Sequence, residues 1–273
     1  MSSSSDDLRR ESLRQLLRTR RRELDAASVG LPPKPHSRSR GLTIEQTAVL
    51  ARLSVRGYAK LERGVYHAPR PETLDAVADA LRMDERLRAD LYFLATEHRP
   101  AAPRRPPTAA QPCHWGLARA SAPHPALVTD HVSTVLAHNS HAEALFAETD
   151  PGTLTGTNLA LWVFTEEAAR GVQGIDVLRR SAIARLKATA IAYHEDEPVD
   201  GIIKQLHEIP GAELLWRHER ARADRGPTLV RYRGPEHQAQ QLTWTRTEGD
   251  DGTILHTGLP HAATPDDTPR PRP

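Results

Sequence analysis

The pattern best suited to chemistry lies between Leu42 and Gly64, in the stretch LTIEQTAVLARLSVRGYAKLERG. It reads as two short helices joined by a tight turn at residues 52–54, which is typical of a helix-turn-helix. Tyr58 and Leu61 would hold the second helix on a core and leave its other face exposed. We predict that this outer face carries Val55, Arg56, Ala59, Lys60 and Arg63. Because Arg and Lys can donate hydrogen bonds to O6 and N7 of guanine, the pattern predicts reading of the DNA major groove.

Basic residues are concentrated in the first part of the chain. Residues 1–110 hold 21 Lys and Arg against 14 Asp and Glu, whereas the remaining residues hold 16 against 21. Between Arg9 and Arg70 there are 15 basic and 5 acidic residues, and 13 of the basic ones are arginine. The planar guanidinium suits phosphate recognition, so the expected partner of this part is double-stranded DNA. Solvated helix faces alone could also explain such charge, and the 42–64 pattern is what favours DNA.

The other reactive side chains do not form a catalytic pattern. His138 and His141 are spaced i, i+3 on a predicted helix, but no third metal ligand lies nearby. Cys113 is the only cysteine, which excludes an intrachain disulfide and a thiolate-based zinc or iron–sulfur site. A Gly-rich phosphate loop and a G-x-S-x-G turn are both absent from the sequence. We therefore expect no metal, no cofactor and no catalytic residue, and we do not expect an enzyme.

The location of the protein follows from its hydropathy pattern. No stretch approaches 18 consecutive apolar residues, the length that a transmembrane helix needs. The N-terminus, MSSSSDDLRRES, lacks the apolar core of a signal peptide. We expect a cytoplasmic protein without membrane insertion.

Helix signals predict an all-α helix-turn-helix domain of five helices within residues 1–98. The expected helices span 8–24, 43–51, 54–63, 71–81 and 84–95. Thr43 and Gln46 have the spacing of a capping box, Ser54 can cap the next helix, and Pro71 fits a first helical turn. Residues 28–41 contain three prolines and therefore predict a loop.

The rest of the chain predicts a second domain of a different class. Residues 99–124 are rich in proline and are expected to be a linker, and residues 261–273 a disordered tail. Between them, residues 125–260 read as two short strands, a short helix, three helical pieces over 175–217 and three further strands. This order predicts an α+β domain around an antiparallel sheet of five strands.

These motifs resemble a known family. The stretch S-V-x-x-Y-x-x-L-E-x-G, the long loop containing SRSRGL before it and PETLDAVADALRMDERLRADLYFLA after it are similar to Xre-type helix-turn-helix proteins. The segments VTDHVSTVLAHNSHAEALF, NLALWVF and ELLWRHE follow in the order seen in bacterial regulators with a MmyB-like, PAS-type ligand-binding domain. The resemblance covers about residues 8–260, and Arg52 stands where that family usually has glycine. It implies that Arg38 and Arg40 contact the DNA backbone and that the second domain holds a fatty acyl chain.

We therefore predict a transcription regulator that binds a specific DNA sequence as a homodimer and senses a hydrophobic small molecule, such as a fatty acid. The expected DNA-binding residues are Arg38, Arg40, Thr43, Ser54, Val55, Arg56, Gly57, Lys60 and Arg63. The residues expected between the sheet and its helices, around the ligand, are Val135, Phe146, Trp162, Phe164, Leu186, Leu206, Trp216 and Trp244, with His218 at the pocket mouth. The alternative is an antitoxin-like or scaffold protein whose second domain binds another protein.

Overall fold

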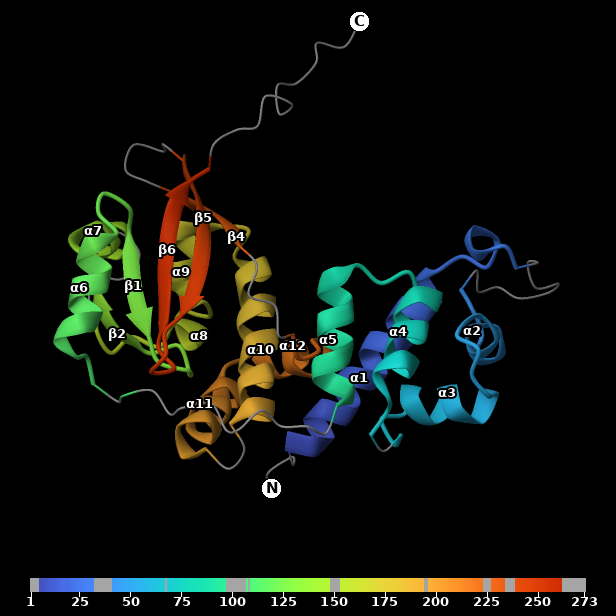
Figure 1. Cartoon of the computed structure of the whole chain (residues 1–273). Helices are drawn as coiled ribbons and strands as arrows, with labels where there is room; N and C mark the ends of the chain where they lie inside the picture. Colours follow the sequence, from blue (N-terminus) through green and yellow to red (C-terminus); the bar gives the residue numbers. More distant parts are fainter. Residues whose placement is uncertain are drawn as a thin grey trace, which may run out of the picture. The chain divides into compact units, whose positions relative to one another are not determined.

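The computed structural model describes residues 5–31, 41–66, 68–96, 107, 109–147, 153–193, 196–222, 227–233 and 239–261. These residues form two compact units (Figure 1). The helical unit comprises the described residues within 1–103, 183–203 and 213–224. The sheet unit comprises those within 104–182, 204–212 and 225–273.

The helical unit contains the helices that the sequence predicts for the first 98 residues. They are α1 (Ser5–Glu23), α2 (Ile44–Leu50), α3 (Val55–Glu62), α4 (Pro71–Ala80) and α5 (Glu85–Ala95). The predicted caps are also present, because Thr43 and Gln46 form a reciprocal capping box and the Ser54 side chain accepts from the backbone of Gly57. Local signals at the helix ends therefore place these helices within a few residues of their observed bounds.

One apolar core holds these helices together. Leu13, Leu16 and Leu17 of α1 are buried in it, and Tyr58 and Leu61 bring α3 against them. Full burial of one such leucine contributes about 1.5–3 kcal/mol. The same core includes Ile191 and Ala221, which come from the second half of the sequence.

The turn between α2 and α3 has an unusual backbone. Arg52 has φ 54°, in the left-handed region that favours glycine. An L side chain costs about 1–2 kcal/mol in this conformation. The turn between α2 and α3 therefore has the left-handed backbone conformation although residue 52 is an arginine and not a glycine.

The sheet unit is built on a curled antiparallel sheet. Its strands are β1 (Ala126–Thr129), β2 (Val135–His138), β3 (Val172–Gln173), β4 (Thr228–Arg233), β5 (Ala239–Glu248) and β6 (Ile254–Pro260). They lie in the order β2-β1-β6-β5-β4-β3. The five predicted strands are confirmed, and β3 adds a sixth at the edge. A strand of two residues is too short to show an alternating pattern, which explains why the sequence did not predict it.

Helices precede the sheet and lie between its strands. Those before β4 are α6 (Pro112–Ala120), α7 (Ser140–Ala147), α8 (Leu159–Trp162), α9 (Glu166–Gly171), α10 (Ile175–Ala192), α11 (Glu197–Glu208) and α12 (Ala212–His218). The last three correspond to the three helical pieces expected over 175–217. The helix α10 begins in the sheet unit and ends in the helical unit, and residues 213–218 of α12 belong to the helical unit.

The expectation of a linker over residues 99–124 is wrong for its second part. Pro112 starts the helix α6, where its missing N–H and fixed φ suit the first turn. The backbone N–H of Gln111 donates to Nδ1 of His114, and Nε2 of His114 lies 2.8 Å from Asp251 Oδ2. The helix is thereby tied to the turn between β5 and β6.

The two faces of the sheet differ as the alternation along its strands requires. Val230 and Tyr232 of β4 and Leu242 and Trp244 of β5 are buried in one cluster, whereas Leu229 on the other face is exposed. The helices of the unit therefore cover one face of β4 and β5. Within the described residues, no helix is both long and apolar enough to cross a membrane.

Candidate DNA interface and ligand-binding core

The helix α3 has one buried and one exposed face. Tyr58 and Leu61 are 0% and 1% exposed and anchor the helix on the core. Val55 is 45% exposed, and Arg56 and Lys60 are also exposed. The side chains that sequence reasoning assigned to base reading therefore share the solvent-facing side of one helix.

A buried ion pair, which sequence reasoning missed, fixes α3 to α1. Arg21 donates from Nε and Nη2 to the two carboxylate oxygens of Glu62, both at 2.8 Å. The two side chains are only 12% and 9% exposed. Burial raises the pKa of the neighbouring Tyr58 hydroxyl, and the Glu62 carboxylate raises this pKa further. The available signal was a carboxylate one turn after Tyr58, on the apolar face of α3.

Two of the predicted DNA-binding residues, Thr43 and Ser54, are helix N-caps. The Thr43 hydroxyl accepts from Gln46 N at 3.1 Å, and the Ser54 hydroxyl accepts from Gly57 N at 3.0 Å. Each hydroxyl thus caps its helix with a lone pair and keeps its proton for another acceptor. The backbone N–H of Gly57 is therefore engaged within the helix, and a side chain at this position would meet the Ser54 hydroxyl at 3.0 Å.

The structure describes one of the three remaining arginines predicted to bind DNA, Arg63, which caps the C-terminus of α3. Arg63 is exposed, and its Nε donates to the carbonyl of Ala59 one turn earlier. Arg38 and Arg40 lie outside the described residues.

The arginines of α1 fall into two groups. One group donates hydrogen bonds to backbone carbonyls of other helices or loops within the helical unit. Its members are Arg9, Arg20 and Arg21. The exposed arginines repeat every four residues and share one side of the helix. They are Arg10, Arg14, Arg18 and Arg22.

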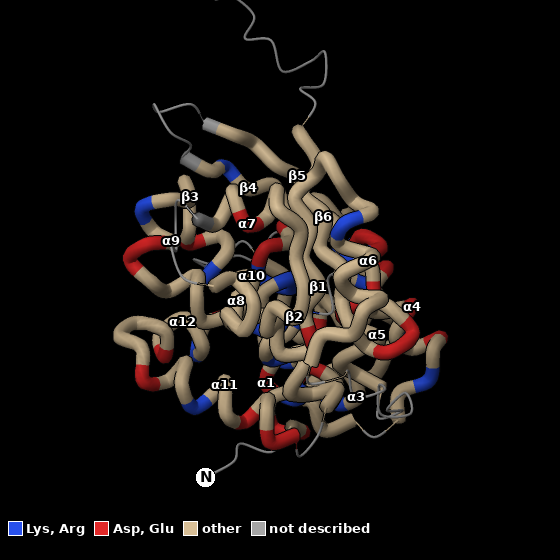
Figure 2. Tube along the Cα trace, turned by 90° about the vertical axis from the view of Figure 1, so that its left-hand side faces the viewer, with Lys and Arg blue, Asp and Glu red and all other residues tan. Residues whose placement is uncertain are grey.

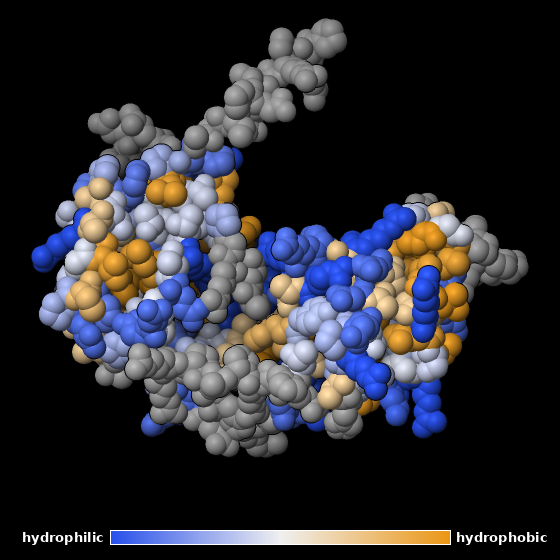
Figure 3. Space-filling model, viewed as in Figure 1, coloured by the Kyte–Doolittle hydropathy of each residue, from blue (hydrophilic) through white to orange (hydrophobic). Residues whose placement is uncertain are grey.

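Charge and hydropathy distinguish two sides of the helical unit. Acidic residues mark α4 and α5 (Figure 2), where Arg88 is bound to Asp75 and Asp79. Apolar side chains gather on the surface over α2 (Figure 3). Val49 of this helix is 68% exposed. A polyanion would meet less repulsion at α2 and α3 than at α4 and α5.

Four of the predicted ligand-binding residues lie in one apolar cluster of the sheet unit. They are Val135, Phe146, Trp162 and Trp244. The Phe146 ring is 5.0 Å from that of Trp162 and 6.4 Å from that of Tyr232. Trp162 is 5% exposed, and its Nε1 has no hydrogen-bond partner among the described residues. Burial raises the pKa of the Tyr232 hydroxyl, and the adjacent Trp244 indole opposes this rise. The cluster thus combines packed aromatic rings with the buried N–H groups of Trp162 and Trp244.

The other predicted ligand-binding residues are dispersed. Phe164 packs at the edge of the cluster, with the Arg179 guanidinium 5.7 Å from its ring. Leu206 is buried in the sheet unit, and Leu186 is buried on the part of α10 that belongs to the helical unit. Trp216 lies on α12 in the helical unit, so the expectation that it sits between the sheet and its helices is wrong. His218, expected at the pocket mouth, lies on the same helix.

The histidine pair does not share one helix. His138 ends β2 and His141 lies in α7, and both line a groove of about 400 Å³ with Trp115 and Arg119. Among the described residues there is no cluster of three side chains that could hold a metal ion. Cys113 is exposed on α6.

Comparison with known proteins gives two family matches. Residues 115–269 match the family model of the MmyB-like transcription regulator ligand binding domain. Residues 12–91 match the family model of a helix-turn-helix domain. No curated protein matches the chain. The two matched ranges agree with the resemblance that the sequence motifs carry.

Proposed function

Because this chain belongs to the family of MmyB-like transcription regulators and carries a helix-turn-helix domain, we propose that α3 reads a specific duplex DNA sequence and that an apolar small molecule regulates this binding. The observation that carries the proposal is the two-faced α3, with Tyr58 and Leu61 buried and Val55, Arg56 and Lys60 exposed.

The first turn of α3 sets the base preference. Arg56 reaches guanine O6 and N7, and the exposed methyl groups of Val55 contact a thymine methyl. Lys60 follows on the same helix, Arg63 caps its C-terminus, and both meet the edge of the groove. Arg56 is therefore the residue whose loss changes the base preference most.

Phosphate contacts come from the surrounding elements. The Ser54 and Thr43 hydroxyls donate to phosphate oxygens at the starts of α3 and α2. Arg38 and Arg40 add charge from the segment before α2, and the exposed arginines of α1 add long-range attraction. These contacts orient the protein on DNA and make its affinity salt-dependent, but they carry no base preference.

The regulator acts as a homodimer in the bacterial cytoplasm. Two reading helices related by a two-fold axis must enter successive major grooves on one face of the DNA. The operator is therefore an inverted repeat whose half-site centres are about 10–10.5 base pairs apart, or a multiple of that.

The ligand is a fatty acid or another largely apolar molecule held in the sheet unit. The aromatic side chains of Phe146, Trp162 and Trp244 surround its chain. The Trp162 N–H, which has no partner among the described residues, donates to a carbonyl or carboxylate oxygen of the ligand. The polar end thus lies inside the cluster and not beside His218.

Selection of duplexes from a random pool by the full chain tests the DNA part of the proposal. We expect an enriched inverted repeat, and Arg56→Ala should relax the preference at one base pair in each half-site. Arg170→Ala is the matched control, because Arg170 is an exposed arginine of the sheet unit. Failure to enrich any sequence, at every salt concentration tried, would contradict the proposal.

Denaturing extraction and mass spectrometry of the purified chain test the ligand part. Titration with decanoic acid should change the tryptophan fluorescence, and Trp162→Phe should weaken binding while Trp115→Phe, on α6, should not. A chain that yields no small molecule and gains no thermal stability from decanoic acid would instead fit a protein-binding module.

A further inference from the structure

We propose that residues 213–222 are a positioning element of the DNA-binding unit, and that Arg220 and Ala221 hold α1 and α5 in the arrangement that presents α3. These residues lie inside the range that matches the ligand-binding domain, yet they are built into the helical unit. The inference rests on the proposed function only where DNA affinity is the readout.

Ala221 joins the core of the helical unit directly. It is fully buried and belongs to the same cluster as Leu13, Leu16 and Leu17. Its backbone N–H donates to the Ser12 hydroxyl of α1 at 3.0 Å, and both groups are buried. A segment some 200 positions away in the sequence thus completes the apolar face of α1 and satisfies a buried hydroxyl of that helix.

Arg220 fixes the same segment to α5. Its Nη1 lies 2.8 Å from Asp90 Oδ2. The side chains of Arg220 and Asp90 are 16% and 2% exposed. A charged pair this far from water is sensitive to geometry, because each charge has been removed from solvent and depends on its partner's position. The pair therefore specifies one placement of residues 213–222 on α5.

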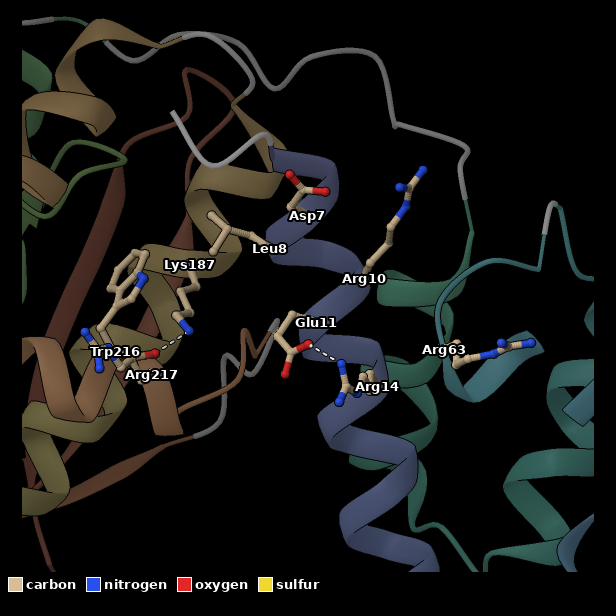
Figure 4. Close-up of a pocket in the computed structure, with 9 residues that line it drawn as sticks. All are labelled: Asp7, Leu8, Arg10, Glu11, Arg14, Arg63, Lys187, Trp216 and Arg217. Carbon is tan, nitrogen blue, oxygen red and sulfur yellow. Dashed lines mark hydrogen bonds and ion pairs between the residues drawn. The ribbon is translucent and has the colours of Figure 1, made fainter. Parts of the chain in front are cut away.

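Polar contacts also hold the segment in shape. Lys187 of α10 donates to the carbonyls of Trp216 and Glu219, the second at 2.7 Å, and lies 4.9 Å from the Trp216 ring centroid. Figure 4 shows Lys187 directed at the Trp216 carbonyl, beside a groove of about 470 Å³ that α1 also lines. The backbone N–H of Arg222 donates to Ala184 at 3.1 Å. The end of α12 is thus tied to α10 by side-chain and backbone contacts.

A continuous set of contacts leads from this segment to the reading helix. The backbone N–H of Ala221 donates to Ser12 of α1. On the same helix, the Arg21 guanidinium donates to the Glu62 carboxylate of α3. Arg9 of α1 donates to Leu94 of α5, so the two helices that the segment contacts are also joined to each other. Displacement of residues 213–222 would therefore change the placement of α1 and, through it, of α3.

The helix α10 contributes side chains to the cores of both units. Ile175, Leu178 and Ala182 pack in the core of the sheet unit, whereas Ala188 and Ile191 pack in the core of the helical unit. Lys187 lies on the second part and holds α12.

Hydrogen exchange of the full chain tests the proposal without needing the ligand. Arg220→Gln removes the guanidinium from Asp90, and Ser12→Ala removes the acceptor of the Ala221 amide. Arg217→Gln is the matched control, since Arg217 is an exposed arginine of the same segment that pairs with Glu213. We expect amides of α1 and α3 to exchange about tenfold faster in both test variants, a size typical of coupling between sites. The control should match the wild type.

A role limited to local packing gives a different pattern. Faster exchange confined to residues 213–222, or an equal change in Arg217→Gln, would overturn the proposal. If Arg220→Gln unfolds the unit, Ser12→Ala decides, because it removes one hydroxyl and leaves the ion pair. If the amides of α1 and α3 in Ser12→Ala exchanged as slowly as in the wild type, the proposal would be contradicted.

DNA binding supplies a second readout on a duplex selected by the wild type. Affinity should fall about tenfold in Arg220→Gln and stay unchanged in Arg217→Gln, and Arg220→Lys should restore part of the loss. If the wild type selects no duplex, the proposed DNA reading fails, whereas the exchange pattern still decides the positioning role.

Discussion

Removing the buried carboxylate of Glu62 should uncouple α3 from α1. Glu62→Gln keeps the size of the side chain but leaves the Arg21 guanidinium without its charged partner in a site where the two side chains are 12% and 9% exposed. Breaking a buried ion pair costs about 3–5 kcal/mol. Since the amide oxygen can still accept one of the two hydrogen bonds and Arg21 also donates to Leu42, we expect the low end of that range.

Urea titration of the full chain, followed by circular dichroism, measures this loss. The matched control is Glu213→Gln, which breaks the exposed pair with Arg217. Exposed pairs contribute about 0–1 kcal/mol, so the control should unfold almost as the wild type does. A loss in Glu62→Gln no larger than that of the control would refute the reasoning that this pair holds the reading helix. A stable Glu62→Gln with unchanged DNA affinity would refute it as well.

Three further predictions concern the turn between α2 and α3, the buried Lys187 and the arginines that precede α2 in the sequence. Arg52→Gly should raise the free energy of unfolding by about 0.5–1 kcal/mol in a thermal melt, because relief of the left-handed backbone exceeds the added freedom of the unfolded chain; a lower melting temperature would contradict this. The Lys187 pKa is lowered to about 8, mainly by burial, from 10.5. The unfolded chain therefore binds more protons between these pH values, so stability should rise with pH across that window by up to about 3 kcal/mol. Lys187→Met should lose this rise, and an unchanged slope in urea titrations at several pH values would count against it. Arg38→Ala or Arg40→Ala should weaken binding of all duplexes equally and reduce the slope of log affinity against log salt concentration by about one. A changed base preference in either variant would contradict a phosphate role.

Local signals account for what the sequence predicts well. Thr43 with Gln46, Ser54 and Pro71 mark helix ends through contacts within a few residues, so the helix-turn-helix could be placed before any tertiary contact was known. The long strands of the sheet follow in the same way from their alternation. Local signals also misled at α6, where many prolines indicated a linker although one of them starts a helix.

The features that the sequence did not predict depend on contacts between residues that are far apart in the chain. Arg21 and Glu62 are 41 positions apart, and Arg220 and Asp90 are 130 apart. Nothing in the pattern around either partner identifies the other. For the same reason Trp216 and His218 were expected beside the sheet, because the sequence shows a domain boundary by composition and cannot show that α12 packs in the other unit. A fragment ending near residue 96 would lack Ile191, Arg220 and Ala221, so the helical unit is not complete without them.

The central claim is that α3 reads DNA bases through Arg56. Equilibrium titration of the wild type and Arg56→Ala against the selected duplex, and against variants changed at each base pair, tests it most directly. We expect Arg56→Ala to lose about 1–3 kcal/mol of binding free energy on the selected duplex and to relax the preference at one base pair of each half-site. An Arg56→Ala protein that keeps the wild-type preference at every base pair would contradict it.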